Sequence, residues 1–251
     1  MGGADSAGVP WEGRHFEPNA SADDDGSAPP RLIEAIRRFR ARELGEQDVV
    51  DALRDARLLI PLVAELGDHG VTDSGHLVDK SQELSIVRVS GPDGRVVQPV
   101  FTSVAAMAAW NPAARPIPAA APRVALAAAA ESTDLVVLDP TSDSEFAVRR
   151  PALWSIAQSQ PWEPCYLDPL VLEAFMRAAE PEAAVRQVQL APGDPDARLT
   201  GSELIVRLSL IDGLDREALD ALLARLGDRW SSSELIAERV DSMAVRLVSV
   251  A

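Results

Sequence analysis

The 251-residue chain contains little of several residue types, and each shortage excludes a class of protein. A single cysteine, Cys165, excludes an internal disulfide and is typical of a reducing compartment. The most apolar run, residues 124–130, is far shorter than the roughly 20 residues that a membrane helix needs. The first residues show no basic segment followed by an apolar one, which is the pattern of a secretory signal. We therefore expect a cytoplasmic protein that does not cross a membrane.

Basic residues are also scarce. The chain has 24 of them against 39 acidic residues, and the net charge of −15 opposes general binding to a nucleic-acid backbone. Only one basic residue, Lys80, is a lysine, and alanine is abundant. This balance is typical of GC-rich coding and predicts a high-GC bacterial source.

The charge is distributed unevenly. Residues 1–28 hold six acidic residues against one arginine, a net charge of −5, and are rich in Gly, Ala, Ser, Asp and Pro. Such a segment buries too little apolar surface to offset the entropy cost of ordering, so we predict a disordered acidic tail. Residues 31–43 reverse the sign with five arginines against two glutamates, and apolar residues at helical spacing predict a basic helix there.

Apolar periodicity predicts an α+β fold after the tail, with a mixed or antiparallel sheet and helices in an N-terminal domain, residues 29–165. The expected helices are 29–42, 46–56, 103–110, 122–131 and 151–158, and the expected strands are 58–64, 84–89, 95–101, 134–138 and 145–149. Pro61 predicts that its strand begins or edges a sheet, because proline cannot donate to the ladder. The Gly-Pro-Asp-Gly sequence at 91–94 predicts an antiparallel hairpin between its flanking strands.

Prolines and the Asp168-Pro169 helix start mark a domain junction between about residues 160 and 168. Beyond it we predict a smaller, ββαβ-like C-terminal domain, residues 166–251. Its expected elements are a helix over 169–179, strands over 185–190 and 203–211, a helix capped by Asp215, a helix opened by a capping box at Ser231-x-x-Glu234, and a strand over 243–250.

Four sequence motifs lie in the N-terminal domain. They are 79–84 (DKSQEL), 94–103 (GRVVQPVFTS) with Trp110 seven residues later, 134–140 (DLVVLDP) and 150–154 (RPALW). Together they resemble the N-terminal domain of the SseB-like family, named for enhanced serine sensitivity. The resemblance covers roughly residues 50–165, and the last 80 or so residues are similar to the family's smaller C-terminal region. It implies an indirect link to serine tolerance and to sulfurtransferase function, and it carries over no catalytic residue.

Candidate catalytic and metal sites are weak. Cys165 lacks a neighbouring His or Arg that would stabilise a thiolate, so an ordinary packed or surface cysteine is favoured over a sulfur carrier. His69 and His76 share a loop with aspartates but lack zinc-ligand spacing, and Ser74 lacks the Gly-x-Ser-x-Gly elbow of a hydrolase. No phosphate loop or dinucleotide fingerprint is present. We therefore expect no catalytic residue, no metal and no cofactor.

The candidate interaction residues are aromatic and basic. They are Phe101, Trp110, Trp162, Arg37, Arg38 and Arg40. Tryptophan is enriched at interface hot spots but also fills cores, and arginines on a helix dock acidic partners or form a solvated face. The sequence favours a non-enzymatic protein-interaction or regulatory protein with a partly apolar groove near Trp110 and Trp162. Two alternatives stay open: an accessory to sulfur transfer or serine-related metabolism that uses Cys165, and a translation- or RNA-associated factor that uses the basic helix.

Overall fold

The computed structural model describes residues 24–65, 83–91, 94–131, 133 and 135–248. Its first group of elements comprises α1 (Pro30–Arg40), α2 (Glu46–Arg54), β1 (Arg57–Glu65), β2 (Glu83–Ile86), β3 (Val89–Ser90), β4 (Val96–Val100), α3 (Val104–Trp110), β5 (Arg115–Ala120), α4 (Ala121–Ala130), β6 (Leu135–Leu138), β7 (Phe146–Arg149) and α5 (Arg150–Ala157). The second group comprises α6 (Pro169–Ala179), β8 (Val185–Pro192), β9 (Leu204–Leu210), α7 (Arg216–Ser231), α8 (Glu234–Arg239) and β10 (Met243–Val248). The fold is α+β, as the sequence predicts.

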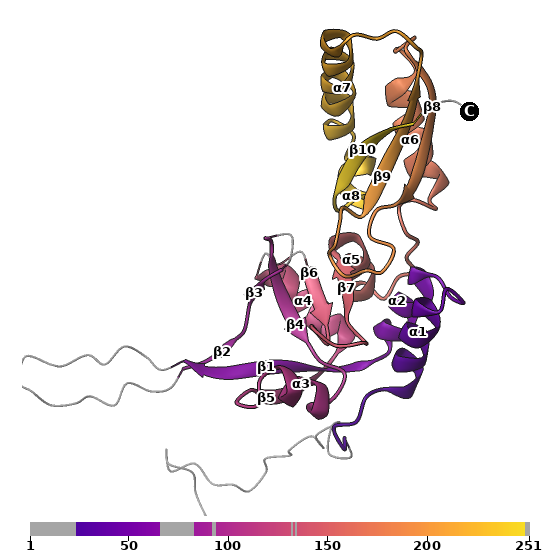
Figure 1. The fold of residues 1–251 in the computed structure, drawn as a ribbon. Coiled ribbons are helices and arrows are strands. Elements are labelled where there is room, and N and C mark those ends of the chain that lie inside the picture. Colours follow the sequence, from indigo (N-terminus) through magenta and orange to yellow (C-terminus); the bar gives the residue numbers. More distant parts are fainter. Residues whose placement is uncertain (1–23, 66–82, 92–93, 132, 134, 249–251) are drawn as a thin grey trace, which may run out of the picture.

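The two groups lie one above the other in Figure 1, and each has its own hydrophobic core. The first group contains the sheets β2-β1-β5 and β3-β4-β6-β7, and the second contains β10-β9-β8. The chain is not divided cleanly at residue 165, because Ala197 of the β8–β9 loop packs in the first core. The exact domain boundary stays a prediction.

The four-stranded sheet has two different faces. Val136 and Val148 point from β6 and β7 into the first core, where they meet helices α1, α2, α4 and α5. Their neighbours Val137 and Ala147 point the other way, into a small cluster that includes Leu199 of the β8–β9 loop. Among the described residues, no helix contributes to this small cluster, so the second face is covered only in part.

The second core forms where α6, α7 and α8 pack against one face of the C-terminal sheet. Alternate residues of β9, from Leu204 to Leu208, are buried there, and Phe175 packs on Trp230 with ring centroids 5.3 Å apart. β10 runs parallel to β9, and β8 runs antiparallel to it.

Prolines in β1 and β5 misled the sequence prediction twice, about the position of β1 in its sheet and about the existence of β5. β1 is the central strand of its sheet although it contains Pro61, and β5, which contains Pro116 and Pro118, was not predicted as a strand. Leu59 exchanges both backbone hydrogen bonds with Phe101, on the side away from β5. Alternate residues of a strand direct their backbone N–H and C=O groups to the same edge, so the Pro61 nitrogen also faces away from β5. On that side, the ladder with β2 begins only at the next residue, Leu62. No backbone donor is therefore missing from the ladder with β5.

The predicted hairpin exists only beside its turn. β3 and β4 pair through Val89 with Val97 and Ser90 with Val96, whereas β2 pairs with β1 instead. The chain changes sheets at residues 87–88, because β1 offers β2 a longer ladder of four residue pairs.

Two further predictions are corrected. α7 continues to Ser231, so the cap of α8 is Ser233, whose hydroxyl accepts from the Ile236 amide. Residues 24–28, which the sequence assigns to the disordered tail, contact the fold: Asp24 forms an ion pair with Arg57 at 2.7 Å. Residues 1–23 lie outside the described residues.

Candidate functional site

The partly covered face of the four-stranded sheet carries an apolar groove of about 450 Å³, which we call the sheet groove. Each of the four strands contributes to its lining through Val89, Val97, Val137 and Ala147. The remaining lining includes Trp110, Pro99, Pro140, Thr141 and Leu199. Five of the lining residues, Val97, Pro99, Trp110, Val137 and Pro140, belong to the motifs singled out in the sequence.

Helix α3 positions Trp110 at the sheet groove. Ser103 caps the helix by accepting from the Ala106 amide at 3.0 Å, and Asn111 ends it. Phe101 is fully buried beneath Trp110, with ring centroids 5.2 Å apart. Trp110 is therefore the ring of this pair that lines the groove.

A buried hydrogen-bond cluster fixes the strand ends next to the groove. β4 and β6 are parallel neighbours, so the residues that follow them, Thr102 and Asp139, meet at one edge. Asp139 accepts from the Thr102 amide at 2.8 Å, from the Thr102 hydroxyl at 2.7 Å and from the Ser144 hydroxyl at 2.8 Å. All three donors bind the Asp139 carboxylate, so this cluster holds the ends of β4 and β6 in place. It leaves no free catalytic group.

Trp162 lines a different hollow, of about 690 Å³, between α5 and the second group of elements. We call it the seam groove; its lining is Gln47, Pro151, Trp154, Ser155, Gln158, Gln160, Pro161, Trp162, Glu163, Asp168, Pro169, Leu170, Glu238 and Arg239. Phe101, Trp110 and Trp162 thus do not share one surface. The sequence quoted Trp154 only as part of a motif, although its side chain is 45% exposed in this groove.

The predicted basic helix is α1, and its arginines are already paired. Arg37 binds Glu34 at 2.7 Å, and Arg38 binds Glu43 at 3.0 Å. Arg40 donates to the backbone carbonyls of Glu145 and Asp196 and so ties α1 to the β8–β9 loop. These pairings leave little uncompensated positive charge for a phosphate backbone.

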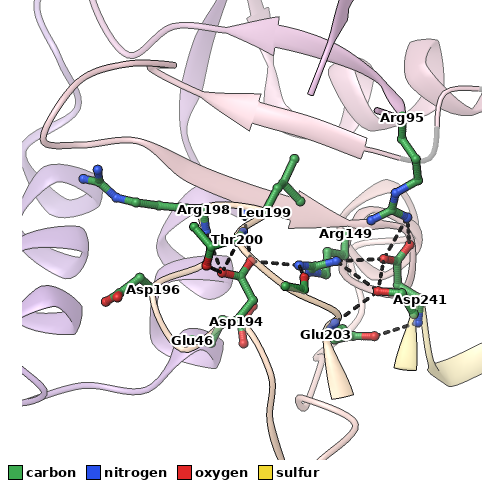
Figure 2. Close-up of polar contacts among 12 residues, drawn as sticks. Glu46, Arg95, Arg149, Asp194, Asp196, Arg198, Leu199, Thr200, Glu203 and Asp241 are labelled. Carbon is green, nitrogen blue, oxygen red and sulfur yellow. Dashed lines mark hydrogen bonds and ion pairs between the residues drawn. The ribbon is translucent and has the colours of Figure 1, made fainter. Parts of the chain in front are cut away.

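A polar network missed by the sequence analysis joins the two cores, with Arg149 at its centre (Figure 2). The Arg149 side chain is 3% exposed and binds Asp194 at 2.8 Å and Asp241 at 3.0 Å. Arg95 reaches the same Asp241 at 2.9 Å. Asp194 also accepts from the Leu199 amide and the Thr200 hydroxyl. Burial alone would raise the pKa of Asp194, but the hydrogen bonds from Arg149 and Thr200 hold it below its ordinary value.

Two carboxyl groups beside this network behave differently. Burial raises the pKa of Glu203 to about 7, although the Asp241 amide donates to it at 2.6 Å. Burial and the charge of Glu203 raise the pKa of Glu46 to about 7, although the Tyr166 hydroxyl donates to it at 3.3 Å. Both groups lie where the cores meet, so their protonation is coupled to how the cores pack.

Cys165 is buried in the second core and is next to these carboxyls. Burial and then the charge of Glu203 raise the pKa of its thiol far above the ordinary value. A persulfide carrier requires an accessible thiolate, and this environment favours the neutral thiol.

Within the described residues, no group of three or more His, Cys, Asp or Glu side chains is placed to hold a metal ion. His69, His76 and Ser74, the weak candidates of the sequence, lie outside the described residues. The same part of the chain contains no helix with the length and apolar character of a membrane span.

These features define a class: an α+β protein with two cores, an apolar groove on a sheet face, and buried charges that are bonded to one another. Residues 32–155 match the family model of the SseB protein N-terminal domain, and the chain belongs to the SseB family. Comparison with curated proteins and with solved structures gave no match. The sheet groove lies within the matched residues except where the β8–β9 loop closes it.

Proposed function

We propose that this SseB-family protein is a non-enzymatic binding or regulatory protein, and that it holds an apolar segment of a partner protein in the sheet groove. The observation that carries the proposal is the apolar lining that all four strands, and Trp110 at the end of α3, present on the partly covered face of the sheet. Trp110 is anchored on Phe101, so a partner gains a large contact without ordering a loose ring. The proposal includes a cytoplasmic location, which the single cysteine supports.

The two alternatives receive less support. A sulfur-transfer role would need a thiolate at Cys165, whose burial favours the thiol. An RNA-associated role would need free arginines on α1, where Arg37, Arg38 and Arg40 have partners within the protein.

The proposal is tested by recovering partners from a native-host lysate with the wild type and two groove variants. Trp110→Ala removes the ring, and Thr141→Arg places bulk at the rim. Thr141 is exposed and has a φ of 67°, a conformation that strains a β-branched residue, so Thr141→Arg should fold normally. Leu126→Ala, an exposed apolar position on α4 outside the groove, is the control.

We expect both groove variants to lose the same partner while Leu126→Ala keeps it. Partner lists that are identical in all four proteins would refute the sheet groove as a binding site.

A further inference from the structure

The seam groove contains aromatic and apolar side chains that the proposed function does not use. Trp154 is 45% exposed and Leu170 is 49% exposed, although both are large apolar residues. The Arg150 guanidinium lies 5.6 Å from the centroid of the Trp154 ring and donates to the carbonyls of Ala237 and Val240 in the second group. The ring is therefore held in place while its surface stays accessible, as in a preformed binding site.

The seam groove is lined by polar groups that are free to bind a ligand, and two of them, the indole N–H groups, can only donate. Gln47, Gln158 and Gln160 make no side-chain hydrogen bond to another described residue, and neither do the indole N–H groups of Trp154 and Trp162. The indole N–H groups suit a ligand that offers carbonyl oxygens, and each glutamine can donate to such an oxygen through its amide nitrogen. A proline-rich segment in the polyproline II conformation has this property, because proline lacks an N–H and this helix has no internal hydrogen bonds.

The charge of the groove adds a second requirement. Among the described residues, Glu163 and Glu238 have no ion-pair partner, whereas Arg239 is paired with Asp168. The groove thus carries uncompensated negative charge at its lining and fits a ligand with a positive residue.

We propose that the seam groove binds a proline-rich segment of another protein, with the prolines packed on Trp154 and Trp162 and an arginine or lysine of that segment paired with Glu163 and Glu238. Aromatic-lined grooves recognise polyproline II segments in this way. The site needs both groups of elements, since α5 supplies Trp154 and α8 supplies Glu238. It is separate from the sheet groove, so either site can exist without the other.

The test is a fluorescence anisotropy titration of the full-length protein against a fluorescein-labelled decapeptide of eight prolines between two arginines. We expect saturable binding that Trp154→Ala weakens at least about tenfold, the usual range for an interface hot spot. The Glu163→Gln and Glu238→Gln double variant should weaken binding and reduce its dependence on salt. Leu126→Ala should bind as the wild type does, and circular dichroism confirms that each variant is folded.

Three results would overturn the proposal. The first is an absence of saturable binding, or an unchanged affinity in the folded Trp154→Ala variant. The second is equal affinity for a glycine-serine decapeptide with the same two arginines, because recognition would then not depend on polyproline II. The third is equal affinity for the proline peptide with glutamates in place of the arginines, because Glu163 and Glu238 would then not select the charge.

Discussion

Helix α1 and the buried Arg149 network between the two cores both contain arginines bonded to carboxylates, but these arginines differ in their exposure to water. Arg37 and Glu34 are more than half exposed, whereas Arg149, Asp194 and Asp241 are at most 3% exposed. Water screens the first pair, and the side chains lose entropy by pairing, so such pairs contribute about 0 to 1 kcal/mol. In the second region each charge depends on the others, because none has access to water. The arginine–carboxylate pair therefore contributes little on the surface of α1, whereas in the Arg149 network it holds the two cores together.

The largest effect is expected from Arg149→Met, which removes the central cation and leaves Asp194 and Asp241 buried. Loss of one partner from a buried ion pair costs about 3 to 5 kcal/mol, and we expect a decrease of that size in the free energy of unfolding, measured with urea. Arg225→Met is the control, since Arg225 is half exposed and Arg229 still pairs with Glu182. An equal decrease in the free energy of unfolding in the two variants would mean that burial does not determine how much an arginine–carboxylate pair contributes.

A smaller effect depends on pH. The folded pKa of Glu203 is about 7, against an ordinary value of 4.5, so the folded state holds a proton that the unfolded state releases between these values. The stability contribution of this group is full below pH 4.5 and is lost as the pH rises through 7. The loss is at most about 3.5 kcal/mol, from about 1.4 kcal/mol for each pKa unit. Glu182 has the opposite shift, to about 2, so its stability contribution is full above pH 4.5 and is lost only as the pH falls from 4.5 through 2.

Glu203→Gln should therefore be more stable than the wild type at pH 8 and close to it at pH 5. The glutamine oxygen can still accept from the Asp241 amide, so the variant isolates the charge. Urea unfolding at the two pH values measures the difference. Part of the wild-type pH dependence should survive in the variant, because Glu46 titrates in the same range. A variant that follows the wild type at both pH values would contradict the assignment.

The parts of the fold that were predicted from sequence are those set by local chemistry. Asp168 and Asp215 cap the helices that follow them, and each does so through its own side chain and a nearby amide. β5 was missed because its prolines argue against a strand locally. Its pairing with β1 depends on residues nearly 60 positions away, such as Leu59 with Pro118.

The candidate site shows the same division. Trp110 was identified because tryptophan is distinctive in the sequence, and it does line a groove. Trp162 was assigned to the same surface because sequence gives no distance between residues that are not neighbours along the chain. Arg149 was missed for a similar reason, since Asp194 and Asp241 are 45 and 92 residues away. A buried arginine leaves no local pattern, because its partners come from different loops.

The smallest effect is expected on α1 and separates two arginines that look alike in the sequence. Arg37→Ala should change the free energy of unfolding by less than about 0.5 kcal/mol, because its pair with Glu34 is exposed. Arg40→Ala should cost about 1 to 3 kcal/mol, because Arg40 is mostly buried and its loss leaves the carbonyls of Glu145 and Asp196 without their donor. Thermal and urea unfolding of both variants measure the difference. If Arg37→Ala lowered the stability as much as Arg40→Ala, the exposure of an arginine would not determine its contribution, and it could not explain the difference between the exposed pairs of α1 and the buried Arg149 network.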